Sequence, residues 1–144
     1  MKFSTVIVGA GRGLRAGYNV NKIIKKICGT PLLYYTLEAF CNISGCIETI
    51  LVVSSLDYNN PVLQKKMLSK YGVTKIVIGG ERRSDSVAAG VFASDSSAEY
   101  VLIHDAARPF IKRNRIREVL SAAEKTGAAI LAIPVSDTLK KGNE

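Results

Sequence analysis

The sequence predicts an α/β fold in which a mainly parallel sheet carries helices on both faces, a Rossmann-like three-layer arrangement. Short apolar runs rich in β-branched residues alternate with segments of helical spacing, and each run stops at glycine or polar residues. The chain has 144 residues, of which 47% are hydrophobic. This size and composition predict a single domain, residues 1–144, with a buried core.

The first three elements follow from short-range patterns. Phe3 to Val8 is predicted as a buried strand because it is short, rich in β-branched residues and stopped by Gly9. After a long basic loop, residues 31–40 place apolar side chains at helical spacing with Pro31 in the first turn, which predicts a helix. Residues 48–55 (ETILVVSS) form the second predicted strand.

The middle of the chain repeats this alternation. Asn60-Pro61 starts a predicted helix that runs to about Tyr71 and is ended by Gly72. Residues 74–78 (TKIVI) form a third predicted strand, and a Ser-Asp-Ser cap precedes a predicted helix over residues 86–93.

The last part of the chain adds two predicted strands, 100–104 (YVLIH) and 128–135 (AAILAIPV), and a helix over 114–125 whose mixed charges suit a solvated face. The alternation of strand and helix predicts right-handed parallel crossovers. Ligands of such sheets bind beyond the carboxyl ends of the strands. The candidate binding loops are 9–22, 54–59, 79–86 and 105–109.

Positive charge is concentrated in the first quarter of the chain. Residues 1–37 hold six of the 20 basic residues and none of the 12 acidic ones, and the formal net charge is +8. A small phosphorylated ligand suits this pattern better than nucleic acid, because the basic residues form no long stripe interleaved with aromatics.

Other compositional features narrow the class of protein. No apolar run is long enough to span a membrane and no signal peptide is recognisable, so we expect a cytoplasmic protein with no membrane or nucleic-acid partner. The three cysteines lack Cys-x-x-Cys spacing and the chain has one histidine, so we interpret them as reduced packing residues rather than zinc ligands.

The loop from Gly9 to Gly17 (GAGRGLRAG) has four glycines in nine residues. Glycines let backbone N–H groups approach phosphate oxygens, so we interpret the loop as a phosphate cradle, with a plain tight turn as the alternative. Gly11-x-Gly13-x-x-Ala16 also fits a dinucleotide fingerprint, but the acidic residue expected about 20 positions later is absent. A Walker P-loop is excluded because no Gly-Lys-Ser/Thr follows the glycines.

Two further loops carry polar groups at the same predicted edge. Gly79-Gly80 enters a helix where Ser86 and backbone N–H groups could hold a base or phosphate, or could simply cap the helix. Asp105, at the tip of the fourth strand, is suited to hold Mg²⁺ between protein and phosphates. For His104 we favour a packed strand residue over a catalytic one, and Arg108 could equally be a surface salt-bridge partner.

With these motifs in place, the sequence resembles the bacterial 4-diphosphocytidyl-2-C-methyl-D-erythritol synthase family, the methylerythritol-phosphate cytidylyltransferases. The resemblance spans the whole chain. The matching residues are Ala10-Gly11-x-Gly13-x-Arg15, Lys22, Gly29-x-Pro31-Leu32-Leu33, Gly79-Gly80-x-x-Arg83-x-x-Ser86-Val87-x-x-Gly90, His104-Asp105-Ala106-Ala107-Arg108-Pro109 and Pro134-Val135-x-Asp137-Thr138.

The resemblance implies a Rossmann-like nucleotidyltransferase fold and a Mg²⁺-dependent transfer of CMP from CTP to methylerythritol phosphate, with release of pyrophosphate, in non-mevalonate isoprenoid synthesis. By family position, Arg15 and Lys22 are the catalytic cations at the transferred phosphate, and Asp105 engages the metal. Arg108 and Thr138 lie near the methylerythritol phosphate, in a site that a homodimer completes. The CTP pocket is assigned to Gly9, Ala10, Gly11, Gly13, Gly80, Glu81, Ser86 and Ala106.

Three departures from the family pattern stand out. The family usually has proline before the loop lysine and glutamine after it, whereas Lys22 lies between Asn21 and Ile23. Position 9 is usually alanine and is Gly9 in this chain. The chain also ends at Glu144, where family members continue into an arm used for dimerisation, so we expect a shortened form.

The alternatives that stay open are a ribitol-phosphate or other sugar nucleotidyltransferase, a nucleotide-binding fragment without turnover, and a dinucleotide-dependent oxidoreductase domain. The Ala-Ala-Arg-Pro element favours the methylerythritol-phosphate enzyme over the first of these. The missing acidic residue after the second strand argues against the oxidoreductase.

Overall fold

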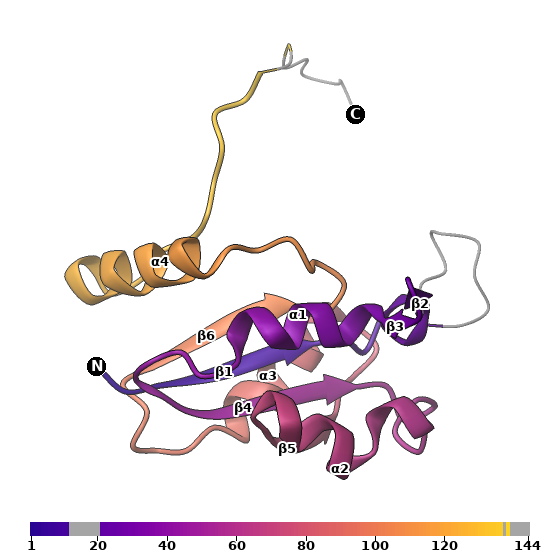
Figure 1. Ribbon diagram of the computed structural model, residues 1–144. Coiled ribbons are helices and arrows are strands. Elements are labelled where there is room, and N and C mark those ends of the chain that lie inside the picture. Colours follow the sequence, from indigo (N-terminus) through magenta and orange to yellow (C-terminus); the bar gives the residue numbers. More distant parts are fainter. Residues whose placement is uncertain (12–20, 137, 139–144) are drawn as a thin grey trace, which may run out of the picture. The chain divides into compact units, whose positions relative to one another are not determined.

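The computed structural model describes residues 1–11, 21–136 and 138. It divides into two compact units, residues 1–113 and 114–144, each of which is described by itself. The first unit is built on a four-stranded parallel sheet with helices on both faces (Figure 1), as the sequence predicts.

The sheet has the strand order β5-β4-β1-β6, and every neighbouring pair is parallel. Its strands are β1 (Phe3–Val8), β4 (Cys46–Val53), β5 (Val73–Ile78) and β6 (Tyr100–Asp105). A separate antiparallel hairpin pairs β2 (Lys26–Ile27) with β3 (Thr30–Pro31).

The α-helices are α1 (Leu32–Phe40), the single turn α2 (Lys65–Leu68), α3 (Arg83–Phe92) and α4 (Arg113–Thr126). Three short 3₁₀ turns are η2 (Lys22–Ile24), η3 (Pro61–Leu63) and η4 (Ser69–Tyr71). Among the residues described, none of the helices has the length and apolar content that a membrane crossing requires.

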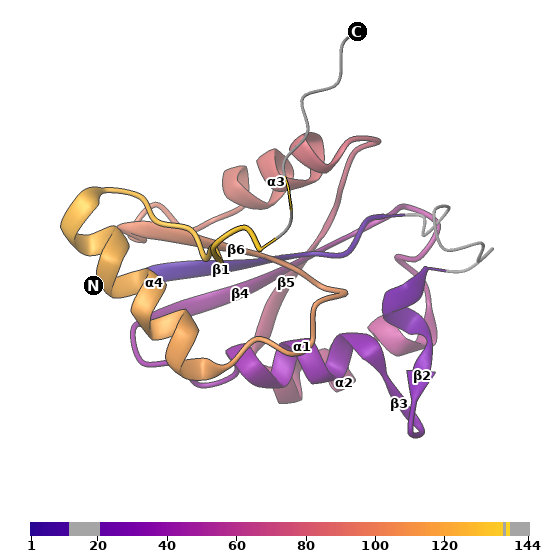
Figure 2. The same ribbon diagram turned by 90° about the horizontal axis from the view of Figure 1, so that it is seen from above.

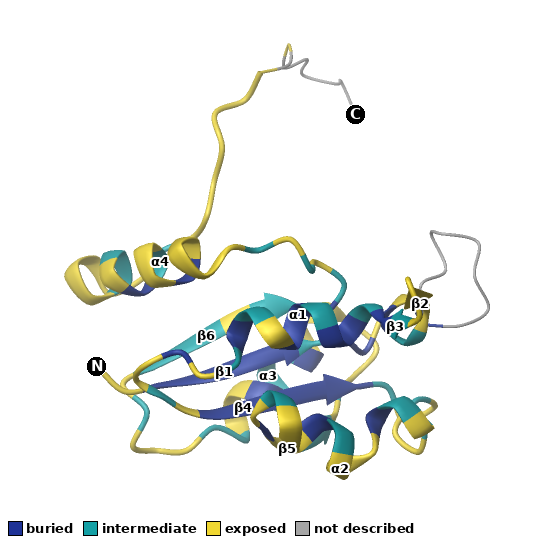
Figure 3. Cartoon of the chain, in the orientation of Figure 1, coloured by how far each residue is buried: buried dark blue, intermediate teal, exposed yellow. Residues whose placement is uncertain are grey.

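The sheet forms the middle layer of the first unit, with α3 on one side and α1 and α2 on the other (Figure 2). Strands β1 and β4 are the most deeply buried elements (Figure 3), because they are central and covered on both faces. Gly90 lets α3 approach the sheet closely, since a Cβ at this position would overlap the side chain of Val6. Val6, Ile50 and Val52 form the core beneath that helix.

One predicted helix is broken into three turns. Residues 61–71 form η3, α2 and η4, and Gln64 between the first two has an extended backbone (φ −62°, ψ 133°). Leu63 and Leu68 are both buried, yet residues five apart lie on different faces of a continuous helix. The interruption therefore lets both leucines pack inward. Gly72, with φ of 78°, ends the segment as predicted.

Several predicted boundaries are shifted, and two of the shifts have a clear local cause. Helix α3 begins at Arg83, three residues earlier than predicted, because the Asp85 carboxylate accepts a hydrogen bond from the N–H of Arg82 at 3.1 Å and caps the first turn. Strand β4 ends at Val53 rather than residue 55, because the Ser54 hydroxyl donates to Asp57 in the following turn.

The prediction of a fifth strand over residues 128–135 is wrong for this structure, which assigns no strand there. The side chains of Ile130, Ile133 and Val135 are 87%, 88% and 66% exposed. A strand requires ladder hydrogen bonds from a neighbour, so apolar β-branched composition is not sufficient to form one.

The β2–β3 hairpin was not predicted. Its two-residue turn, Cys28-Gly29, has positive φ at both positions (49° and 81°), as tight hairpin turns require. Cysteine is an unusual residue in such a turn, so the sequence carried only the glycine as a signal.

Candidate functional site

The carboxyl ends of the four parallel strands lie at one edge of the sheet and bring three predicted loops together (Figure 1). Backbone hydrogen bonds fix the first residues beyond the strands. The N–H of Gly9 donates to Val52 O at 2.7 Å, that of Gly79 to Val53 O at 2.8 Å and that of Ala106 to Val8 O at 2.8 Å. The start of each loop is therefore held by the neighbouring strand.

The two glycine loops touch at Gly79. A Cβ at this position would lie 2.5 Å from Ser86 Oγ and 3.0 Å from the Ala10 methyl group, so only glycine fits there. By contrast, no atom of the described residues lies within 4 Å of a Cβ built on Gly11. Ala10 and Ser86, two of the predicted CTP residues, thus lie on either side of Gly79 where the two loops meet.

Ser86 does not lie at the helix end. It is buried inside the first turns of α3, and its hydroxyl lies 3.3 Å from Arg82 O and 3.4 Å from Gly80 O, to which it donates. The hydroxyl therefore fixes the Gly80 turn in this structure. Glu81, the next predicted residue of the turn, is exposed.

Asp105 lies between two arginines. Its Oδ1 accepts hydrogen bonds from Arg83 Nε at 3.0 Å and Nη2 at 2.9 Å, and its Oδ2 pairs with Arg108 Nε at 2.9 Å. The carboxylate is 28% exposed, whereas the arginine side chains are 62% and 76% exposed. Because exposed ion pairs are weak, these arginines can exchange the carboxylate for a charged ligand at small cost.

His104 is a packed strand residue, in agreement with the favoured interpretation. Its ring packs against Phe40, with centroids 4.8 Å apart, and its Nε2 lies 3.0 Å from Arg108 O. Burial lowers the pKa of His104, and the Arg108 carbonyl and the Asp105 charge oppose that shift only in part. A neutral ring at neutral pH is the consequence.

Ala106 is fully buried, and its carbonyl accepts a hydrogen bond from the hydroxyl of Thr36 on α1 at 2.7 Å. Helix α1 thereby holds the turn that follows Asp105. The predicted role of Ala106 in the CTP pocket would have to use its backbone, because its side chain is inside the core.

Lys22, the predicted catalytic cation, is the first residue of η2 and is exposed. Asn21 caps this turn, because its side-chain oxygen accepts a hydrogen bond from the N–H of Ile23 at 3.3 Å. Gly13 and Arg15 lie outside the described residues. Thr138 is described and exposed, and it belongs to the second unit.

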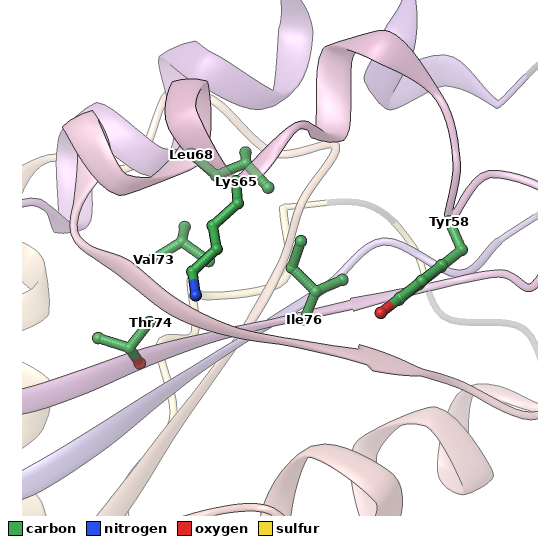
Figure 4. Close-up of a pocket in the computed structure, with 6 residues that line it drawn as sticks. All are labelled: Tyr58, Lys65, Leu68, Val73, Thr74 and Ile76. Atoms are coloured by element: carbon green, nitrogen blue, oxygen red, sulfur yellow. The ribbon is translucent and has the colours of Figure 1, made fainter.

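A cavity of about 250 Å³ lies beside β5 and α2 (Figure 4). Its lining residues are Tyr58, Lys65, Leu68, Val73, Thr74 and Ile76, of which only Tyr58 belongs to a predicted binding loop, 54–59. Lys65 supplies the only charge among these six side chains. The strand tips, with their cations and carboxylate, are chemically better suited to a phosphorylated ligand.

Sequence reasoning missed two residues of this edge. The sequence marks Arg83 only as part of a motif, yet it makes two hydrogen bonds to Asp105. The sequence marks Asn21 only as a departure from the family pattern, yet it is buried and fully hydrogen-bonded. The place of Arg83 in the Gly-Gly-x-x-Arg motif is a possible signal for its role, whereas the pattern around Asn21 does not indicate its contacts.

The comparisons with known proteins agree with the motifs. The family model of 2-C-methyl-D-erythritol 4-phosphate cytidylyltransferase matches residues 3–144. A protein of that name from Alkaliphilus metalliredigens is 40% identical over 146 residues, which cover 99% of this chain and 60% of the relative. One from Caldanaerobacter subterraneus subsp. tengcongensis is 40% identical over 147 residues, covering 100% of this chain and 64% of the relative.

Solved structures give the same result for the fold. The 4-diphosphocytidyl-2C-methyl-D-erythritol synthase from Anaerococcus prevotii has a TM-score of 0.70 and 30% identity, over 86% of this chain and 51% of that one. A second crystal structure of such a synthase has a TM-score of 0.75 and 25% identity, over 99% of this chain and 64% of that one. The chain thus spans about 60% of the length of the curated relatives it matches.

Proposed function

Because the chain belongs to the 2-C-methyl-D-erythritol 4-phosphate cytidylyltransferase family, we propose that it transfers CMP from CTP to 2-C-methyl-D-erythritol 4-phosphate and releases pyrophosphate. The observation that carries the proposal is the gathering of Lys22, the two glycine loops and Asp105 at one edge of a parallel sheet. Parallel α/β sheets bind nucleotides at that edge.

The cations account for the phosphoryl chemistry. Attack on the α-phosphate of CTP builds negative charge on its equatorial oxygens, and fixed positive groups stabilise that charge. We assign this role to Lys22 and Arg15. Lys22 is suited to it because the residue is exposed and follows a buried, hydrogen-bonded Asn21.

The donor set at the strand tips fits a metal ion bound together with phosphates. Among the described residues, no three His, Cys, Asp or Glu side chains group closely enough to form a protein cage for a metal. Mg²⁺ usually keeps several waters and binds through one or two carboxylates plus substrate phosphates. Asp105 is the carboxylate that would hold it, and the ion would neutralise charge on the triphosphate.

We assign the acceptor phosphate to Arg108, whose guanidinium is largely exposed next to Asp105. The family resemblance alone adds Thr138, which belongs to the second unit. Guanidinium groups bind phosphate through two parallel hydrogen bonds, which suits a phosphorylated polyol. A homodimer and a cytoplasmic location complete the proposal. Ribitol phosphate is the competing acceptor to be included in the assay.

Pyrophosphate release from CTP and 2-C-methyl-D-erythritol 4-phosphate with Mg²⁺ tests the proposed function. We expect release with this acceptor and CTP, less with ribitol phosphate or ATP, and a decrease of about 100-fold or more in Lys22→Ala, as for removal of one transition-state donor. CTP binding without pyrophosphate release would indicate a nucleotide-binding unit. Binding of NAD in preference to CTP would contradict the proposal.

A further inference from the structure

Two of the departures from the family pattern, Gly9 and the pair around Lys22, meet in space. Asn21 and Ile23 flank Lys22 in the sequence, and both are buried, at 7% and 2% exposure, although Lys22 between them is exposed. Each of the two contacts Gly9, the first residue beyond β1. The lysine is therefore held from both sides by residues that differ from the family's usual ones.

Asn21 ties its segment to two parts of the sheet edge. Its Nδ2 donates to Gly9 O at 2.7 Å and to Asp57 Oδ2 at 2.8 Å, while its Oδ1 accepts from the N–H of Ile23 at 3.3 Å. Both amide protons and the amide oxygen thus have partners. The bond to Gly9 joins residues 12 positions apart, near the two ends of the predicted binding loop 9–22.

The second partner, Asp57, is itself fixed. Its Oδ2 also accepts a hydrogen bond from the Ser54 hydroxyl at 2.6 Å, and its N–H donates to Ser54 O at 3.1 Å. Ser54 directly follows β4. Hydrogen bonds to a charged group are stronger than neutral ones, so the contact with Asp57 is the firmer of the two.

Ile23 makes the apolar half of the contact. A Cβ built on Gly9 would lie 2.8 Å from Ile23 Cδ1 and 3.2 Å from the Ala106 methyl group. The Ile23 side chain therefore occupies space that an alanine at position 9 would need. This contact explains why glycine accompanies isoleucine in this chain: the first makes room for the second.

We propose that Asn21 and Ile23 are positioning residues that fix Lys22 at the strand tips, Asn21 through Gly9 and Asp57, and Ile23 by packing over Gly9. We call the contacts of Asn21 and Ile23 with Gly9 and Asp57 the anchor. That the anchor presents Lys22 to the CTP phosphates rests on the proposed function.

The first test asks, without any ligand, whether the anchor holds the turn that carries Lys22 in place. Amide hydrogen exchange of residues 23–25 should quicken about tenfold in Asn21→Ala, since the turn loses its cap and both side-chain tethers. Asn60→Ala is the matched control, because Asn60 caps η3 through Val62 N at 3.0 Å in the same way and has no bond to Gly9. An unchanged exchange rate at residues 23–25 in Asn21→Ala would show that Asn21 does not hold this turn.

The second test asks whether the anchor acts through Lys22. Calorimetric titration with CTP and Mg²⁺ should show Asn21→Ala binding about five- to tenfold more weakly, which is the range of one or two hydrogen bonds. The same substitution should change the affinity less than twofold in a Lys22→Ala background, because neighbours that act together are not additive. Equal losses in both backgrounds would overturn the positioning role.

Asn21→Ser distinguishes the two hydrogen bonds that the Asn21 amide donates to Gly9 and Asp57, the tether, from the bond that it accepts from Ile23 N, the cap. Serine retains an oxygen that can accept from Ile23 N, but it lacks the two amide donors. We expect Asn21→Ser to bind CTP as weakly as Asn21→Ala. Wild-type affinity in Asn21→Ser would show that the hydrogen bonds to Gly9 and Asp57 do not contribute. If Lys22→Ala leaves both CTP binding and pyrophosphate release unchanged, the role proposed for Lys22 fails, whereas the exchange experiment still decides on the anchor.

The packing of Ile23 on Gly9 has its own test. Gly9→Ala should weaken CTP binding by displacing Ile23, and adding Ile23→Val should restore most of the affinity, because valine lacks the Cδ1 atom in the contact. If Ile23→Val gives no recovery, Gly9 acts directly on the ligand and the apolar half of the proposal is wrong.

Discussion

The two ends of the sheet each hold a carboxylate bonded to a cation, and the two carboxylates serve different purposes. At the amino end, Glu48 on β4 is buried, with a side chain 7% exposed. It pairs with Lys75 Nζ at 2.8 Å and accepts from Ser4 Oγ at 2.7 Å and from Asp95 N at 2.6 Å. At the carboxyl end, Asp105 is 28% exposed and held by two exposed arginines.

The difference shows what makes an ion pair available to a ligand. Glu48 joins β1, β5 and the segment after α3, so releasing it would break several buried hydrogen bonds. Among the described residues, Asp105 is paired only with exposed arginines, so these partners can change without unfolding the sheet. The hydrogen bonds that join Glu48 to Ser4, Lys75 and Asp95 at the amino end, here called the clasp, therefore stabilise the fold. The carboxyl end is where we expect ligands.

The largest expected effect is on turnover at the carboxyl end. Asp105→Asn should lower pyrophosphate release by about 100-fold, because the carboxylate assigned to Mg²⁺ is lost from the site of developing charge. The free energy of unfolding should change by less than about 1 kcal/mol, as for an exposed ion pair. Steady-state kinetics and urea denaturation measure the two effects. A large loss of stability with unchanged kcat would reverse the assignment of the two ends.

The next effect is on stability at the amino end. Glu48→Ala should lower the free energy of unfolding by about 2–3 kcal/mol, since a buried carboxylate with three donors is removed. Urea denaturation is the measurement. Glu38→Ala on α1 is the control, because the Glu38 side chain is exposed and forms no ion pair with the residues that the structure describes. A loss no greater than that of the control would show that the clasp is dispensable.

The pH dependence of the clasp follows from its partners. Burial alone would raise the pKa of Glu48, but the hydrogen bonds from Lys75, Asp95 N and Ser4, with the Lys75 charge, outweigh it and lower that pKa. A carboxyl group with a lowered pKa stabilises the fold above its ordinary pKa and loses this contribution on acidification. The stability difference between wild type and Glu48→Gln should therefore narrow from about pH 5 downward. Urea denaturation at a series of pH values measures this difference. A difference in the free energy of unfolding that stays constant below pH 5 would contradict the prediction.

The smallest effect concerns the arginines at the carboxyl end. Arg83→Gln should change the free energy of unfolding by less than about 1 kcal/mol, because the pair with Asp105 is solvent-exposed. Thermal denaturation at low and high salt is the measurement. A change as large as that of Glu48→Ala would show that the two ends are built alike.

Most of the fold was predictable because it depends on local patterns. Residues 3–8 match β1 residue for residue, and 31–40 match α1 with Pro31 as its cap. The misses have non-local causes. Leu63 and Leu68 interrupt a helix in order to reach the same core, and residues 128–135 have strand composition without a strand partner in this structure.

The candidate site was predictable in part. The position of Asp105 at a strand tip follows from counting along an apolar run, and β6 ends at that residue. The sequence could not show that Arg83 crosses from α3 to meet it, or that Asn21 reaches Gly9, because both contacts depend on how separate loops approach one another. Ser86 was expected at a helix end and lies inside the helix.

The most direct test of the account is calorimetric titration of CTP, with and without Mg²⁺, into wild type, Asp105→Asn and Glu48→Gln at a temperature where all three are folded. We expect wild type and Glu48→Gln to bind CTP with Mg²⁺ about equally, and Asp105→Asn to lose the gain in affinity from Mg²⁺. An Asp105→Asn variant that responds to Mg²⁺ like wild type would contradict the assignment of nucleotide binding to the carboxyl end of the sheet.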